Sequence, residues 1–153
     1  MKKIFTMLMT SAFVASVSFN CVAKVPETQI SLGGVVPGAT VNSVKAIYGE
    51  PVSSYDGETL TFNNGLVVKV DEERPDIVEE VIITSGSEKI TTPAGISVGM
   101  DDTLLNVAYG TADNVDYERN FVEYVYYSDD TKKKMEFKVE DGVIVKIKCE
   151  LRG

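Results

Sequence analysis

The sequence predicts an α+β fold made of two tandem units, each a short helix packed on a three- to four-stranded antiparallel meander. Two observations lead to this prediction. A glycine-led pattern occurs twice with a constant offset of 61 residues, first as Gly34-Val35, Gly38, Tyr48-Gly49 and then as Gly95-Ile96, Gly99, Tyr109-Gly110. Each copy is followed by β-rich runs separated by turn residues. A fixed internal period is typical of a repeated structural unit.

Residues 1–23 are predicted to be a signal peptide. Lys2 and Lys3 precede an apolar run that ends near Val17, and small residues stand at Cys21 and Ala23. This pattern predicts cleavage after Ala23 and export to the periplasm or the outside of the cell. An uncleaved anchor is the alternative, but the run is short for a membrane span of about 20 residues. Lipid attachment at Cys21 is another alternative. No other long apolar segment follows, so no integral membrane segment is expected after cleavage.

The first unit is expected over residues 34–85, after an N-terminal segment at 24–33. Val41, Val44 and Tyr48 have the spacing of one helix face, with Thr40 as a candidate N-cap and Gly49 at the helix end. Such a short helix is stable only when it packs on a sheet. Three strands are predicted to follow, at 59–62, 66–70 and 77–83.

The second unit is expected over residues 95–153, after a linker at 86–94. Asp101 or Asp102 is predicted to cap its helix, which ends at Gly110. Strands are predicted at 121–127, 134–139 and 143–151. Apolar and charged residues alternate in the last two strands, which predicts one core face and one solvent face. The residues expected to point inward are Met135, Phe137, Val139, Val143, Val145, Ile147 and Cys149.

Composition argues against several classes of function. Lys2 and Lys3 are the only charged residues in 1–23, so cleavage changes the net charge from −8 to −10, which disfavours nucleic-acid binding. The chain contains no histidine, which excludes His-based catalytic triads and His-ligated metals. The acidic runs lack the ligand spacing of a calcium loop. No catalytic site, metal site or cofactor is therefore expected, and the protein is predicted not to be an enzyme.

The strand at 121–127 is the candidate partner-binding element, because it is apolar on both faces. Either Phe121, Val125 and Tyr127 or Val122, Tyr124 and Tyr126 should face the core, and the other set should face solvent beside lysines. Tyrosine with a basic border is typical of protein-binding surfaces. An alternative is a central strand that is packed on both sides. The predicted contact residues are Tyr124, Tyr126, Tyr127, Lys134, Lys138, Lys146 and Lys148.

The segment from Gly95 to Met100, a short helix, Tyr109-Gly110 and a three-strand meander resembles a unit found in two related groups of proteins. One is the secreted β-lactamase inhibitor protein family, and the other is the small lipoprotein of the outer-membrane β-barrel assembly machine. The resemblance implies an α+β unit that binds proteins through its sheet without catalysis. The chain lacks the disulfides of the inhibitors and the lipobox of the lipoprotein, so β-lactamase inhibition is not inferred.

Together these observations predict an exported, non-enzymatic binding module that engages a protein partner through its sheet, in the cell envelope or outside the cell. The alternatives are a protein that binds a small ligand or a cell-wall polymer, and a dedicated enzyme inhibitor or immunity protein. The partner itself is not identified by the sequence.

Overall fold

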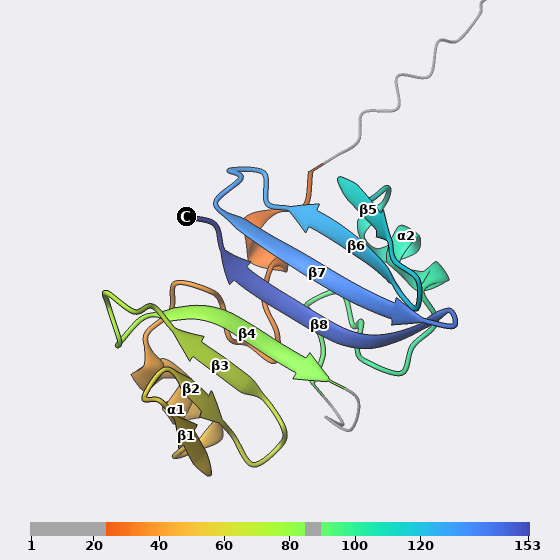
Figure 1. Ribbon diagram of the computed structural model, residues 1–153. Helices are drawn as coiled ribbons and strands as arrows, with labels where there is room; N and C mark the ends of the chain where they lie inside the picture. The colour runs from red at the N-terminus through yellow and green to blue at the C-terminus, as the bar shows by residue number, and fades with distance from the viewer. Residues whose placement is uncertain (1–23, 85–89) are drawn as a thin grey trace, which may run out of the picture.

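The computed structural model describes residues 24–84 and 90–153, and it confirms the α+β class in them. Two α-helices accompany one eight-stranded antiparallel sheet (Figure 1). The predicted signal peptide, 1–23, lies outside the described residues, as does the part of the predicted linker at 86–89. In the described ranges, no helix is long and apolar enough to span a membrane.

The strands follow the order β1-β2-β3-β4-β8-β7-β6-β5, so the two halves of the chain meet where β4 pairs with β8 (Figure 1). All six predicted strands are present, with each end within one residue of the prediction. The two edge strands, β1 and β5, were not predicted. The bounds are η1 Glu27–Gln29, α1 Val41–Tyr48, β1 Ser53–Tyr55, β2 Thr59–Thr61, β3 Val67–Val70, β4 Val78–Thr84, α2 Thr103–Tyr109, β5 Asn114–Tyr117, β6 Val122–Tyr127, β7 Lys133–Glu140 and β8 Val143–Leu151.

Both helices are capped by predicted residues. The Thr40 side chain accepts a hydrogen bond from the backbone N–H of Ser43 at 3.3 Å. At the start of α2 the cap is Asp101 rather than Asp102, because Asp101 Oδ1 accepts from the backbone N–H of Thr103 at 2.9 Å. These bonds satisfy N–H groups that have no partner inside the helix.

The segment that precedes each helix forms a backbone hydrogen bond to the last strand of the same half of the chain. The backbone N–H of Gly38 donates to the carbonyl of Val78, in β4, at 2.7 Å. The backbone N–H of Gly99 donates to the carbonyl of Ile144, in β8, also at 2.7 Å. Each helix is therefore held against the sheet at its N-terminal end.

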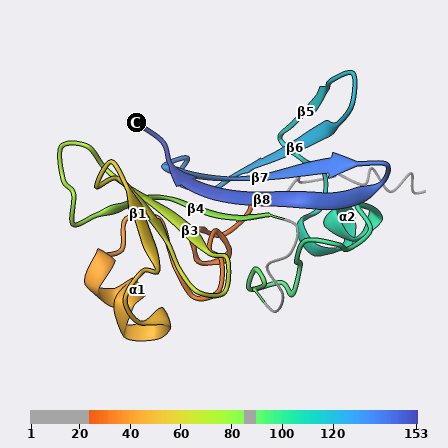
Figure 2. The ribbon, with the colours of Figure 1, turned by 60° about the horizontal axis from the view of Figure 1, so that its bottom comes forward.

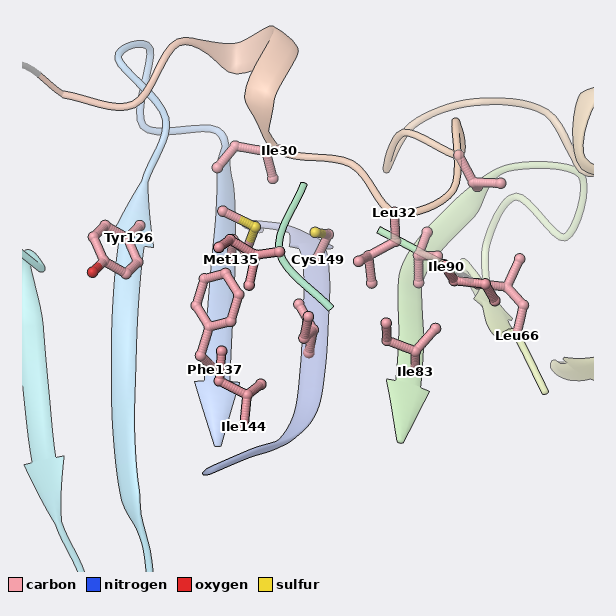
Figure 3. Close-up of a cluster of buried hydrophobic side chains, with 14 of the residues drawn as sticks. Ile30, Leu32, Leu66, Ile83, Ile90, Tyr126, Met135, Phe137, Ile144 and Cys149 are labelled. Carbon is pink, nitrogen blue, oxygen red and sulfur yellow. The ribbon is translucent and has the colours of Figure 1, made fainter. Parts of the chain in front are cut away.

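The core lies between the helices and one face of the sheet (Figure 3). The predicted inward positions Met135, Phe137 and Cys149 are fully buried. Ile30 and Leu32 of the N-terminal segment pack over the same cluster, also with no exposed surface. Burial raises the pKa of the Cys149 thiol, so the side chain stays protonated and acts as a small apolar group.

The prediction that Val143 and Val145 point into the core was wrong. The register between β7 and β8 shifts between Lys138 and Val139. Such a bulge adds one residue to one strand and changes which side chains face inward. Ile144 is fully buried as a result, while Val143 is 40% exposed.

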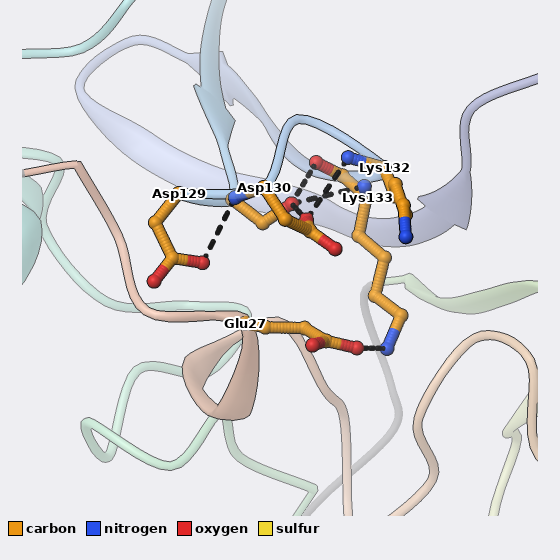
Figure 4. Close-up of polar contacts among 6 residues, drawn as sticks. Glu27, Asp129, Asp130, Lys132 and Lys133 are labelled. Atoms are coloured by element: carbon orange, nitrogen blue, oxygen red, sulfur yellow. Dashed lines mark hydrogen bonds and ion pairs between the residues drawn. The ribbon is translucent and has the colours of Figure 1, made fainter.

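The N-terminal segment is tied to the second half of the chain by polar contacts (Figure 4). The ammonium of Lys133, which is nearly buried, pairs with the carboxylate of Glu27. The backbone N–H of Asp129 donates to the carbonyl of Val25 at 2.9 Å. The sequence had assigned residues 24–33 no such role. Residues 24–33 lie across the core and form polar contacts with the β6–β7 turn.

Candidate functional site

The sheet has one covered face and one open face. Helices α1 and α2 and the N-terminal segment all lie on the same side of it (Figure 2). We call the opposite side the open face. Its polar and aromatic residues on the central strands include Glu80, Glu123, Tyr127, Lys134, Glu136, Lys138, Lys146, Lys148 and Glu150. The apolar residues Ile82 and Val125 lie on the same face and are buried among them.

Two of the three predicted contact tyrosines lie on the covered face. Tyr126 is 2% exposed, and its ring lies 5.3 Å from the ring of Tyr109. Burial raises the pKa of Tyr126 to about 12, and its hydroxyl donates to the carbonyl of Gly110 at 3.3 Å. The Tyr124 hydroxyl donates to Asp102 at 3.2 Å. The set Val122, Tyr124 and Tyr126 is therefore the inward one, which the sequence had left undecided.

The other predicted residues are brought together on the open face. Tyr127 is the cross-strand neighbour of Lys134, and Lys138 is the cross-strand neighbour of Lys146. Lys148 lies beside them on β8. Tyr127 and all four lysines thus share one surface, on the side of the sheet that the alternation of the last two strands predicted for the lysines.

Lys134 and Lys148 are neutralised by two glutamates, which the sequence analysis missed. The Lys134 ammonium lies 2.6 Å from both Glu136 and Glu150, and the Lys148 ammonium lies 2.7 Å and 2.5 Å from the same two carboxylates. The four side chains form a closed ring of alternating charge, with between 11% and 24% of each side chain exposed. We call this the ion-pair ring. It makes the centre of the open face polar and ordered.

The ion-pair ring shifts the pKa values of the side chains that form it. Burial by itself raises the pKa of Glu136, but hydrogen bonds from Lys134 and Lys148 outweigh it, so the pKa lies below its ordinary value. Burial by itself lowers the pKa of Lys148, but hydrogen bonds to Glu136 and Glu150 outweigh it and the pKa is raised. Each charge is thus stabilised by the other members.

Two aromatic rings at the ends of β6 carry cations on their faces. The Lys138 ammonium lies 4.3 Å from the centre of the Phe121 ring, and the Arg152 guanidinium lies 4.4 Å from that of Tyr127. Arg152 was not among the predicted contact residues, and no local pattern in the sequence marks it. Its position becomes apparent only when the end of β8 is placed beside β6 and β7.

The acidic runs have local structural roles. Asp71 accepts from the guanidinium of Arg74 at 2.6 Å and from the backbone N–H of Glu73 at 3.0 Å, within the β3–β4 turn. Asp130 accepts from the Ser128 hydroxyl at 2.6 Å. Within residues 24–84 and 90–153, no group of three or more Asp, Glu, Cys or His side chains is arranged to hold a metal ion.

The ion-pair ring predicts a loss of stability in acid. A carboxylate whose folded pKa is lowered stabilises the fold above its unfolded pKa of about 4.3 and loses that contribution as the pH falls through the folded value. Glu136→Gln should therefore flatten the decline of the unfolding free energy below about pH 5. At neutral pH it should cost about 1–3 kcal/mol, because two half-buried ammonium groups lose a carboxylate between them.

Urea unfolding between neutral and acid pH measures this effect. Glu72→Gln is the matched control, because Glu72 is exposed in the β3–β4 turn and should leave both the stability and its pH profile unchanged. A Glu136→Gln profile that follows the parent protein at every pH would contradict the prediction.

Comparison with known proteins gives a fold but no family. The sequence matches no protein-family model and has no significant match among curated proteins. The structure is similar to that of YjgB, a DUF4309 family protein from Bacillus subtilis, with a TM-score of 0.52 and 14% identity over 78% of this chain and 83% of that one. It is also similar to SAV1118, a cysteine-rich secretory protein from Staphylococcus aureus, with a TM-score of 0.57 and 10% identity over 84% of this chain. That match spans 47% of SAV1118, so the chain corresponds to about half of it.

These similarities correct the resemblance drawn from the sequence. The expected relationship to the β-lactamase inhibitor protein family and to the small lipoprotein of the barrel assembly machine was wrong. The folds that this chain resembles are those of YjgB and of part of SAV1118, at identities that establish a shared fold only.

Proposed function

We propose that this chain is an exported, non-enzymatic protein that binds a partner protein through the open face of its sheet. The observation that carries the proposal is the continuity of this face across the junction of β4 and β8. No helix or loop of the described residues lies over it (Figure 2). A face of several adjacent strands offers the area that a stable protein interface needs.

The composition of the open face supports a protein partner. Tyr127 with Arg152 and Phe121 with Lys138 combine the aromatic and cationic groups that are enriched at interfaces. Because the ion-pair ring already holds its side chains in place, ordering them on binding costs little entropy. Both aromatic rings have a cation over one face, which leaves less room for the sugar stacking that a polymer-binding face would use.

The absence of catalysis is part of the proposal. The one thiol among the described residues, Cys149, is fully buried with a raised pKa, which is unfavourable for a nucleophile. The lysines Lys134 and Lys148 have raised pKa values and paired charges, which is unfavourable for a general base.

Export is proposed from the predicted signal peptide at 1–23. The description of SAV1118 as a secretory protein agrees with it. The surplus of acidic over basic residues is compatible with a protein that works in solution outside the cytoplasm.

We also propose that residues 34–85 and 95–153 are diverged copies of one unit. Each half consists of a helix followed by four strands. Gly38 and Gly99, which occupy matching positions of the sequence motif, both donate a backbone hydrogen bond to the last strand of their half. In each half the register between the last two strands also shifts, between Lys69 and Val70 and between Lys138 and Val139. On this proposal, the β4–β8 junction joins two sheets into the binding face.

Site-specific crosslinking tests the proposed function. Benzoylphenylalanine in place of Tyr127 should form an adduct with one protein from the cell envelope or medium. The matched control puts the same group in place of Tyr55, which is 73% exposed at the β1 edge, and it should give no such adduct. Arg152→Ala should weaken binding of the identified protein by about 2 kcal/mol, or about 30-fold.

Two results would contradict the proposal. One is the same set of adducts from both positions, or none from position 127. The other is retention on purified cell-wall polymer that Tyr127→Ala abolishes, which would favour the polymer-binding alternative.

A further inference from the structure

We propose that the outer edge of β5 and the groove beside helix α2 form a second docking site, which takes an extended, positively charged segment of a partner protein. The groove lies on the covered side at the end of the sheet. Asp116, whose cross-strand neighbour is Glu123, lies on the other side, at the outer margin of the open face and away from the ion-pair ring.

The edge of β5 is available for pairing with another strand. Strand β5 is the last in the sheet and pairs only with β6 in the described part of the chain (Figure 1). Exposed edges are usually blocked by very short strands, charged side chains such as lysine, proline or a bulge. Strand β5 has four residues and one charged side chain, Asp116, which repels an acidic chain but attracts a basic one. Residues 114–117 contain neither lysine nor proline, and their register with β6 is regular. An extended chain can therefore add to this edge through backbone hydrogen bonds.

A groove lies beside Val115 of β5, on the helix side of the sheet. Val115 is the cross-strand neighbour of Tyr124, so its side chain points toward α2. Val115, Leu105 and Ala112 supply apolar surface to a cavity of about 320 Å³ between α2 and the β5–β6 hairpin. A strand paired with β5 would direct the side chain opposite Val115 toward this cavity, because side chains alternate along a strand. The cavity has room for one or two side chains of moderate size.

A carboxylate stands at the mouth of the groove. Asp102 precedes α2 but makes no side-chain capping bond, because Asp101 has that role. Its carboxylate instead accepts from the Tyr124 hydroxyl at 3.2 Å and lines the groove. The remaining lone pairs of this carboxylate can accept from a lysine or arginine that enters the groove.

The outer surface of the edge is also acidic. Asp113, Asp116 and Glu118 lie on or beside β5 and are exposed, with Arg119 as the nearby cation. Tyr117, 79% exposed, adds an aromatic surface at the end of the strand. An incoming strand with basic residues facing Asp116 and apolar or basic residues in the groove is thus complementary in charge and shape. An acidic strand would be repelled on both sides.

An acetylated heptapeptide, Lys-Val-Lys-Leu-Lys-Val-Lys, is a suitable probe. Titration into the isotope-labelled protein should shift the backbone amide signals of β5 and α2 in a two-dimensional NMR spectrum. Asp116→Asn should weaken binding about fivefold, because it removes a charge that faces the lysines of the probe. Asp102→Asn, on the side that receives the valines and leucine, should weaken it less. Asp56→Asn, at the opposite edge of the sheet, is the matched control and should bind as the parent does.

Two altered peptides separate charge from backbone pairing. Glutamate in place of lysine should abolish the shifts, and proline in place of the two valines should weaken them by blocking backbone pairing. Arg152→Ala, which alters the open face, should leave peptide binding unchanged, so this test is independent of the function proposed above. The inference is overturned if the shifts map to β1 or to the ion-pair ring, if the glutamate peptide binds equally well, or if about 1 mM lysine peptide gives no shift.

Discussion

Phe137→Ala is expected to lower the free energy of unfolding by about 3–5 kcal/mol, the largest effect of any single substitution considered for this protein. Phe137 is fully buried at the centre of β7. Its ring lies 5.7 Å from that of Tyr109 and 5.9 Å from that of Tyr126, the latter edge to face. Removing the ring leaves a cavity between a helix and two strands, and the neighbouring backbone has little freedom to fill it.

Urea unfolding followed by circular dichroism measures this change. Tyr55→Ala is the matched aromatic control, because Tyr55 is 73% exposed and its loss should change stability by less than about 0.5 kcal/mol. Tyr126→Ala should behave like Phe137→Ala, since Tyr126 is a core residue and not a surface contact. A loss below about 1 kcal/mol for Phe137→Ala would contradict the packing described here.

Gly33→Ala is expected to destabilise the protein by about 3 kcal/mol, through a steric clash added to backbone strain. Gly33 has a φ of 55°, and a Cβ atom placed on it would lie 2.1 Å from the hydroxyl oxygen of Tyr48. That hydroxyl donates to the carbonyl of Gly33 at 2.6 Å. The alanine methyl would therefore displace the tyrosine and break the bond that holds the end of α1 to the N-terminal segment.

The neighbouring glycine separates the two contributions. Gly34 also has a positive φ, 81°, but a Cβ there would meet its nearest atom only at 3.9 Å. Gly34→Ala should thus cost about 1 kcal/mol from strain alone. In the Tyr48→Phe background, which lacks the hydroxyl, Gly33→Ala should cost less than in the parent protein. It should still cost more than Gly34→Ala, because the Cγ2 atom of Ile90 would lie 3.1 Å from the new Cβ. Equal losses for the two single substitutions would show that no clash exists at Gly33.

The open face has a different energetic character from the core. Its centre is stabilised by charge pairs, which depend on pH, and its ends carry the aromatic and cationic groups. The three tyrosines of β6, which the sequence treated as one group, therefore belong to two environments. Tyr126 is buried in the core, while Tyr127 lies on the open face beneath the guanidinium of Arg152.

The failed resemblance also has a physical explanation. The motif that suggested it consists mostly of glycines. Gly34, Gly38, Gly95 and Gly99 all have positive φ angles, which many turns leading into a helix require regardless of family. Glycine spacing therefore predicted the local geometry correctly and the family wrongly.

The sequence by itself determined the local elements. Both helices and six of the eight strands could be predicted, most clearly where a buried face gives a regular period, as at Met135 and Phe137. Strands β1 and β5 could not be predicted, because they are short edge strands that are mostly exposed and have no such period.

Only the tertiary structure decided what depends on pairing between distant strands. The orientation of β6 was ambiguous because both of its faces are apolar, and packing of Tyr126 against Tyr109 and Phe137 settled it. The neutralisation of Lys148 depends on the register of β7 and β8, which places Glu136 directly across from it. A bulge of one residue also reverses which side chains of a strand face the core, as it does at Ile144. The composition of each face therefore follows from register, which a strand's own sequence does not contain.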